Sequence, residues 1–309
     1  DIPNAQEGWG RISVENSIIP TYQGTELQTY HDNSRQISAG FSALYAFDLD
    51  PSSGLDVTLA WTDIAGSANA AQNESRLVND LDLVLLSPDG TVYKGNVFNN
   101  GFSIPNGVHD SVNNVERIRI APSSSLPSGQ WQISVVHAGG MDQAFSLVVT
   151  GDANLVPVAD LTTFAGSIYS SSASPLVNDL ITLRISWINQ GTVASGNYRV
   201  TFEDLTSGET LYDGTRSSLS PGLMDSLTIY HSFTTTGDHD LRLSVDVDSD
   251  VIEMNDENDG TDNNIWDQTI NVAALGVRLL PLDANGAEDI EQRNQTLDPS
   301  TAEGYTWPI

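Results

Sequence analysis

Short segments in which apolar and polar residues alternate, separated by clusters of Gly, Pro, Asn and Ser, constrain this chain most. The clearest is Ile-Thr-Leu-Arg-Ile-Ser-Trp at residues 181–187, where every second residue is large and apolar. Side chains of a β-strand point alternately to opposite faces, so this pattern predicts a strand with one buried face. Because long helix-forming stretches are absent, we expect an all-β fold.

The predicted strands fall into two groups. The first group predicts a jelly-roll or β-sandwich barrel over residues 21–152, and the second predicts another β-sandwich over residues 159–272. Predicted strands of the first group are residues 38–48, 55–62, 80–86, 91–97, 115–120, 130–137 and 145–150. Those of the second group are residues 180–189, 198–204, 226–233, 240–247 and 265–272. Candidate core aromatics of the first group are Tyr45, Trp61, Trp131 and Phe145.

Three further segments complete the predicted domain organisation. Residues 1–20 are expected to be the tail of an upstream domain, with one or two helical turns at residues 12–17. Residues 153–158 read as a linker. Residues 273–309 are expected to begin a further β domain or to supply edge strands, because so short a segment cannot bury a core of its own.

The charge of the chain excludes several classes of function. It has 41 acidic and 12 basic residues, a formal net charge of -29 and no cysteine. Such acidity argues against binding to nucleic acid or to anionic membranes. It suits either a saline or calcium-rich exterior or solubility alone. The lack of cysteine excludes disulfides, thiol catalysis and cysteine-based zinc sites. No apolar run reaches the ~18 residues expected of a membrane-spanning helix.

Two carboxylates lie on one face of the predicted strand at residues 80–86. Asp80 and Asp82 are about 7 Å apart at Cα in an extended chain, and their charges repel each other. Asn79 adjoins them, and Asp63 ends the preceding predicted strand. Calcium prefers carboxylate, amide and carbonyl oxygens, so this set predicts a calcium site.

A later loop offers weaker ligands, and an alternative without metal stays open. Asp110 and Asn113 would join the calcium site if their loop folded back towards it. In the alternative, Asp80 and Asp82 cap loops or form ion pairs with arginine. The candidate arginines are Arg76, Arg117 and Arg119.

A second acidic cluster has part of the spacing of an EF-hand. Asp246, Asp248, Asp250 and Glu257 occupy positions 1, 3, 5 and 12 of such a loop. Position 6 is Val251, where the sharp turn of an EF-hand needs glycine. We therefore favour an acidic hairpin whose Asp246 and Asp248 face solvent, with a metal site as the weaker alternative.

The chain carries no recognisable catalytic motif. It has five histidines but neither the G-x-S-x-G nor the H-E-x-x-H pattern. His137 ends a predicted strand on its apolar face and is expected to be a core residue. Trp266 and Trp307 are candidates for stacking on sugar rings, although burial in a core is the commoner fate of tryptophan.

Several segments in order resemble subtilisin-like serine proteases that carry a β-barrel after the catalytic domain. The resemblance covers residues 1 to about 151. The segments that carry it are Gln-Glu-Gly-Trp-Gly-Arg-Ile at 6–12, Leu-Ala-Trp-Thr-Asp at 59–63, Leu-Val-Asn-Asp-Leu-Asp-Leu at 77–83, Ser-Pro-Asp-Gly at 87–90, Gly-Asn at 95–96, and Asp-Ser-Val-Asn-Asn-Val-Glu at 110–116.

The resemblance implies a supporting part of a secreted protease. In that family the catalytic Asp, His and Ser all precede the Gly-Trp-Gly segment, and their signature motifs are absent here. The family therefore implies a non-catalytic accessory region, whose partner is an upstream catalytic domain that the barrel stabilises. We expect no proteolysis by this chain itself.

The second group of strands resembles a CARDB-type adhesion module, which has an immunoglobulin-like fold. The resemblance rests on residues 159–161, 187–191, 219–222 and 251–258. It implies a spacer or a surface anchor. The alternative function is that of an extracellular structural or cell-surface protein, built of β-sandwich modules, that binds a protein or glycan partner.

Overall fold

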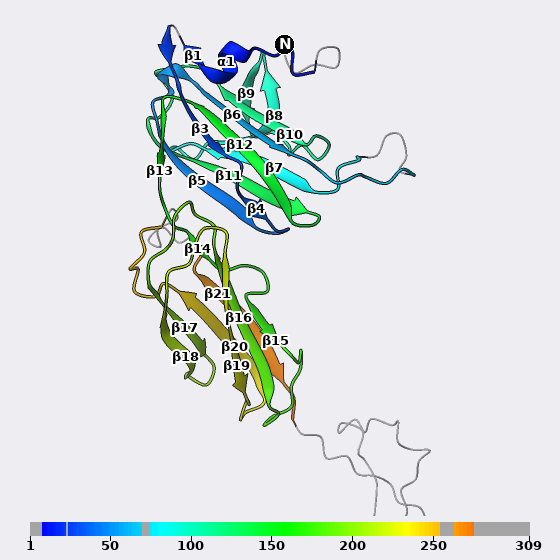
Figure 1. Ribbon diagram of the computed structural model, residues 1–309. Helices are drawn as coiled ribbons and strands as arrows, with labels where there is room; N and C mark the ends of the chain where they lie inside the picture. The colour runs from blue at the N-terminus through cyan, green and yellow to red at the C-terminus, as the bar shows by residue number, and fades with distance from the viewer. Residues whose placement is uncertain (1–7, 23, 70–74, 254–262, 275–309) are drawn as a thin grey trace, which may run out of the picture.

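The computed structural model describes residues 8–22, 24–69, 75–253 and 263–274, and these form two β modules arranged end to end (Figure 1). Within them, helical structure is limited to α1 (Val14–Ile18) and the 3-10 turn η1 (Pro51–Ser53). The all-β expectation is confirmed. The β segment predicted for residues 273–309 lies, from residue 275 onwards, outside the described residues.

The N-terminal module is a sandwich of two antiparallel sheets. One sheet has the order β13-β5-β11-β7-β8-β9, and the other has the order β10-β6-β12-β3, with β4 also pairing with β12. A two-residue pair, β1 (Thr21–Tyr22) and β2 (Thr25–Glu26), precedes them. The strands of the sandwich are β3 (Gln28–Asp32), β4 (Gln36–Ile37), β5 (Ser42–Leu49), β6 (Leu55–Trp61), β7 (Asp80–Leu86), β8 (Val92–Asn99), β9 (Phe102–Pro105), β10 (Val115–Ile120), β11 (Gly129–Gly139), β12 (Gln143–Gly151) and β13 (Ala153–Val156).

The core of the N-terminal module, called the barrel from here on, follows from the period of two in its strands. In β6, Leu55, Val57, Leu59 and Trp61 are buried, and the residues between them are half-exposed. The facing strands contribute the same kind of row, so large side chains from both sheets meet in the middle. The four aromatics predicted for this core are all buried.

The C-terminal module is a second antiparallel sandwich. One sheet has the order β14-β16-β15, with β19 pairing with β16, and the other has the order β18-β17-β20-β21. In β16 the alternating apolar residues at 181–187 all face the core, as predicted. The strands are β14 (Leu161–Thr162), β15 (Ile168–Ser170), β16 (Ile181–Asn189), β17 (Tyr198–Asp204), β18 (Glu209–Arg216), β19 (Met224–His231), β20 (Gly237–Val245) and β21 (Ile265–Val272).

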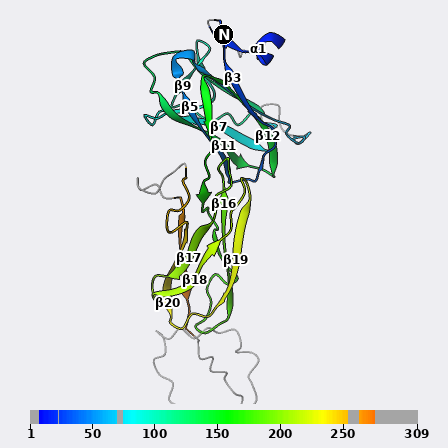
Figure 2. The same ribbon diagram turned by 60° about the vertical axis from the view of Figure 1, so that its left-hand side comes forward.

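The junction between the modules is a bonded contact. Four of the six residues predicted as a linker form β13, which pairs with β5 and belongs to the barrel. Gln190 accepts hydrogen bonds from the Ser42 backbone N–H (2.9 Å) and from Arg35 Nη2 (2.9 Å). The rings of Phe41 and Phe164 meet edge to face, with centroids 4.7 Å apart. Two views show the modules meeting only at their ends (Figures 1 and 2).

Candidate functional site

The predicted calcium residues Asp80 and Asp82 stand at the start of β7. Asp82 is only 6% exposed, and its Oδ1 lies 3.0 Å from His109 Nδ1. Burial is the main cause that raises the pKa of both carboxyls. The alternative pairing with arginine is wrong for Arg117, which bonds Asp56 on the neighbouring strand instead.

A third acid, Glu116 of β10, joins this group and was missed from the sequence. It is 1% exposed, its Oε2 accepts the Leu83 N–H at 2.6 Å, and its Oε1 is without a partner among the described residues. Burial, together with the charges of Asp82 and Asp110, raises the pKa of Glu116 to about 9. One signal was available, because Glu116 occupies an inward position of β10, in step with the buried Ile118.

The other predicted calcium ligands are engaged in holding loops. Asp63 accepts the N–H groups of Val78 (2.7 Å) and Asn79 (3.0 Å). The Asn79 side chain donates to Gln143 at 2.7 Å and accepts the Met141 N–H at 2.7 Å. These contacts fix the chain on the approach to β7.

The loop before β10 is held in the same way. Asp110 accepts hydrogen bonds from Asn96 (2.6 Å) and from the side chain of Asn113 (2.7 Å). Within the described part of the chain, no three His, Asp or Glu side chains gather closely enough to hold a metal ion. The charge of Asp110 raises the pKa of Asp80, Asp82 and Glu116, so these four acids form one electrostatic cluster. Asp63, Asn79 and Asn113 hold the surrounding loops, as Asp110 also does.

The second predicted cluster is a capped turn, and the prediction that Asp246 faces solvent is wrong. Asp246 is 1% exposed, has a φ of 53°, and accepts the N–H groups of Asp250 (3.2 Å) and Val251 (3.0 Å). Its carboxylate closes the turn after β20, which explains why it is buried. Asp248 is exposed as expected and forms an ion pair with Arg199 at 3.2 Å.

Of the remaining candidate residues, His137 and Trp266 are described by the structure and lie in or against a core. His137 is fully buried, and its Nε2 lies 2.7 Å from the Met141 carbonyl oxygen, which confirms the expected core role. Trp266 packs, partly buried, against the core of the second module. Glu257 and Trp307 lie outside the described residues.

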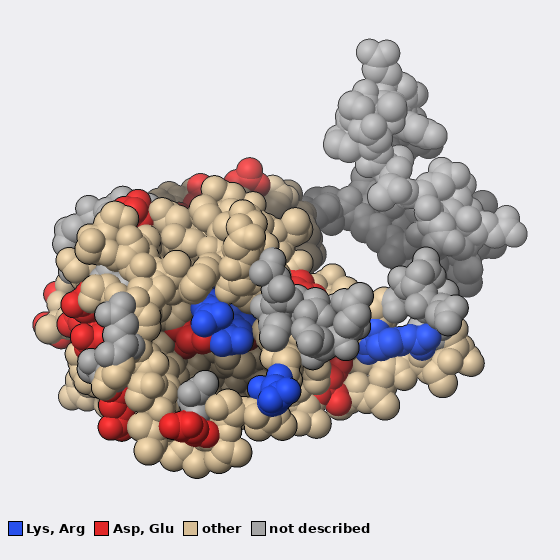
Figure 3. All heavy atoms as spheres, turned by 90° about the horizontal axis from the view of Figure 1, so that it is seen from above, with Lys and Arg blue, Asp and Glu red and all other residues tan. Residues whose placement is uncertain are grey.

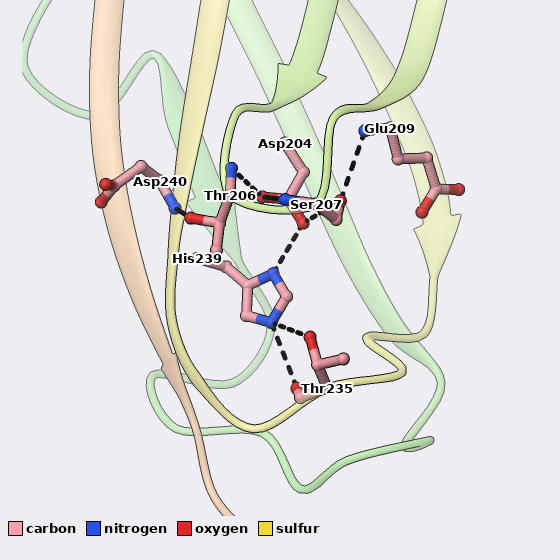
Figure 4. Close-up of polar contacts among 7 residues, drawn as sticks. All are labelled: Asp204, Thr206, Ser207, Glu209, Thr235, His239 and Asp240. Atoms are coloured by element: carbon pink, nitrogen blue, oxygen red, sulfur yellow. Dashed lines mark hydrogen bonds and ion pairs between the residues drawn. The ribbon is translucent and has the colours of Figure 1, made fainter.

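A buried acid–histidine–hydroxyl series in the second module has the order of a hydrolase relay (Figure 4). His239 Nδ1 lies 2.6 Å from Asp204 Oδ2, and both side chains are at most 2% exposed. His239 Nε2 is equally close, at 3.1 Å, to the hydroxyl and to the carbonyl oxygen of Thr235. Because the same ring nitrogen also lies within hydrogen-bond distance of the Thr235 carbonyl oxygen, His239 is not paired with the hydroxyl alone, as the base of a hydrolase would be. Asp204 further accepts the Ser207 hydroxyl at 2.7 Å, so the series clamps the β17–β18 turn to β20.

The N-terminal end of the barrel carries a hollow of about 780 Å³. Three of its lining residues are basic, namely Arg11, Arg117 and Arg119. Figure 3 looks onto this end, where basic side chains border the hollow. The N-terminal segment beside it exposes apolar side chains: Ile12 is 86% exposed and Ile18 is 70% exposed.

Comparison with known families identifies the second module. Residues 158–263 match the CARDB family model. The module is therefore a CARDB domain, as the residues at 187–191 and 251–258 suggested. Among solved structures, the chain is similar to a CARDB domain from Pyrococcus furiosus, solved in complex with di-metal ions, at 22% identity and a TM-score of 0.33. That likeness covers 39% of this chain and 98% of the other.

A domain from a protein assigned to the cell surface of Methanosarcina acetivorans is similar at 20% identity and a TM-score of 0.28, covering 38% of this chain and 93% of the other. A curated relative, the "Serine protease/ABC transporter B family protein tagA" of Dictyostelium discoideum, is 33% identical over 155 residues. The match covers 46% of this chain, and the chain spans 8% of that relative's length. None of the described helices is long and apolar enough to cross a membrane.

Proposed function

We propose that this chain is the non-catalytic accessory region of a secreted subtilisin-like serine endopeptidase. In this proposal the barrel packs against an upstream catalytic domain and stabilises it. The CARDB domain acts as a spacer or a surface anchor. Support comes from the motifs in residues 1–151 and from the relative that is named a serine protease.

One observation carries the proposal: apolar side chains are exposed at the N-terminal end of the barrel. Ile12, Val14 and Ile18 are each at least 65% exposed, and they flank the arginine-lined hollow. Covering such side chains with a neighbouring domain would contribute roughly 25 cal/mol per Å² of apolar surface removed from water. The segment that bears them leads directly into the barrel, so a domain preceding it would meet this end first.

Calcium is part of the same proposal. A cation near Asp80 and Asp82 would offset the repulsion between their carboxylates. Asp80 is half-buried and Asp82 is buried, and the charge of Asp80 acts on Glu116 as well. The loops held by Asp63 and Asn79 would set the distance between these side chains.

The experiment is an assay of the purified chain and of its association with the domain encoded upstream. The chain alone should not hydrolyse casein. The separately expressed upstream domain should bind it, and Ile18→Asp should weaken that binding at least about tenfold, because a charge would be buried at the contact. Glu209→Gln, a change at an exposed residue of the other module, serves as the control. Casein hydrolysis that a serine-directed inhibitor abolishes would contradict the proposal.

The CARDB match also favours a second candidate, an extracellular structural or cell-surface protein that binds a protein or glycan partner. The residues encoded before Asp1 separate the two. A serine protease signature there supports the accessory role, and further β-sandwich modules support the surface protein.

A further inference from the structure

β14 lies at the end of the CARDB domain nearest the barrel (Figure 1). Two buried carboxyl groups adjoin it: Asp160 directly precedes β14, and Glu253 bonds its first residue. Asp160 is 0% exposed. Its Oδ1 accepts a hydrogen bond from Asn263 Nδ2 at 3.0 Å, whereas its Oδ2 is buried and has no partner among the described residues. A buried oxygen without a partner is costly, so this group calls for an explanation.

Glu253 is the second carboxyl group, and it is 7% exposed. Its Oε1 accepts the Leu161 N–H at 2.6 Å, and its Oε2 accepts Asn264 Nδ2 at 2.7 Å. A parallel bridge pairs Glu253 with Ala159. The residues on both sides of Asp160 thus contact Glu253, which places the two acids on adjacent segments of the chain.

An amide oxygen completes the set. Asn263 Oδ1 is buried and has no partner within the described ranges. The backbone of Asn263 is held firmly, because its carbonyl oxygen accepts the N–H of Thr163 at 2.7 Å and the hydroxyl of Thr162 at 3.2 Å. The backbone that carries the Asn263 side chain is therefore fixed by hydrogen bonds without a bound ligand.

The charges at this place are uncompensated. Neither Asp160 nor Glu253 forms an ion pair with a basic side chain of the described residues. Burial raises the pKa of Asp160 to about 6 and that of Glu253 to about 8, and the Asp160 charge adds to the second effect. A cation would remove the repulsion and occupy the free lone pairs.

We propose that Asp160, Glu253 and Asn263 bind a hard divalent cation of the calcium class. The donors are Asp160 Oδ2, the remaining lone pairs of the Glu253 carboxylate and Asn263 Oδ1, all of them oxygen atoms. Two carboxylates and an amide leave room for water in a coordination shell of six to eight, which calcium tolerates better than magnesium does. None of the three belongs to the EF-hand-like set, which consists of Asp246, Asp248, Asp250 and Glu257.

The site connects to the junction between the modules. The Asp160 N–H donates to Asn189 Oδ1 at 3.1 Å, and its carbonyl oxygen accepts the Gln190 N–H at 2.7 Å. Gln190 is the residue that bonds Ser42 and Arg35 of the barrel. A cation at Asp160 would therefore stiffen the connection between the two modules, whatever the barrel itself binds.

The test is calorimetric titration of the whole chain with calcium chloride after removal of bound metal. The wild type should bind calcium at this site in addition to any calcium bound by the barrel. Asp160→Asn should lose that one binding event or weaken it at least about tenfold, because one ligand charge is removed. Glu209→Gln removes an exposed charge from the same module and should bind as the wild type does. Asp82→Asn, in the barrel, should leave the Asp160 site intact.

A second measurement needs no variant. Hydrogen exchange of the wild type should slow at least about tenfold with calcium in the peptides containing residues 159–163 and 189–191. Unchanged exchange there, or unchanged calcium binding in Asp160→Asn, would overturn the proposal. Loss of all calcium binding in Asp82→Asn would assign the cation to the barrel and also overturn it. Neither result bears on whether the barrel docks to a protease domain.

Discussion

At the scale of single residues, Asp204 and His239 show how a catalytic-looking contact serves the fold. Burial alone would raise the pKa of Asp204, but hydrogen bonds from His239 and Ser207 hold it below its ordinary value of 3.8. The folded protein thus binds this proton less readily than the unfolded chain. The stability that Asp204 contributes is present above about pH 4 and is lost as the pH falls through the lowered pKa.

Asp204→Asn should consequently lower the free energy of unfolding by about 2 kcal/mol at pH 7, the usual cost of losing a hydrogen bond to a charged group. The difference from the wild type should shrink as the pH falls from 5 to 2. Urea unfolding at several pH values checks this. If the free energies of unfolding of the wild type and Asp204→Asn differ by the same amount at pH 7 and at pH 2, the stabilisation does not come from the charged form of Asp204.

Calcium in the barrel is the second prediction at this scale. Removing metal with a chelator should lower the melting temperature of the wild-type barrel, because a ligand that binds only the folded form stabilises it by mass action. The barrel of Asp82→Asn should unfold at the same temperature with and without chelator, because only the calcium site of the other module remains in this variant. If the chelator leaves the wild type unchanged as well, the site at Asp80 and Asp82 is not a calcium site.

At the scale of elements, strands with a clean period of two could be predicted and polar strands could not. The pattern found β6 and β16, whose alternate residues face a core. It missed β3 and β18, which are end strands of their sheets and carry few apolar residues. Their pairing depends on backbone hydrogen bonds to a neighbour, which no local pattern reveals.

Some acids of the two sites could not be predicted for the same physical reason. The predicted acids Asp80 and Asp82 share a strand, so their proximity was readable from spacing alone. Glu116, Asp160 and Glu253 become neighbours of other acids only when distant strands pair. Their burial follows from tertiary contacts, and only the inward position of Glu116 on β10 gave a local hint.

The turn between β11 and β12 yields a prediction about the backbone. Gly140 has a φ of 122°, and a Cβ there would collide with the side chain and backbone of Asn79. Gly140→Ala should therefore lower the melting temperature of the barrel. Gly90→Ala is the matched control, because Gly90 has a φ of 83° but open space around it and should cost only about 1–2 kcal/mol. Equal losses in the two variants would show that the collision does not matter.

At the scale of the whole molecule, two sandwiches are joined through one short contact. Gln190 and the Phe41–Phe164 pair form this contact, which is far smaller than either core. Its stiffness decides whether the CARDB domain holds a fixed distance from the barrel or swings. The proposed spacer role requires a fixed distance between the two modules. Cation binding at Asp160 and Glu253 would be a means of controlling that distance.

The central claim is that the barrel supports a protease domain without performing catalysis. The most direct measurement is a titration of the purified chain into the separately purified domain encoded before it, followed by melting of the mixture. We expect saturable binding and a higher melting temperature of that domain, together with no casein hydrolysis by the chain alone. No binding and no change in melting temperature would contradict the claim.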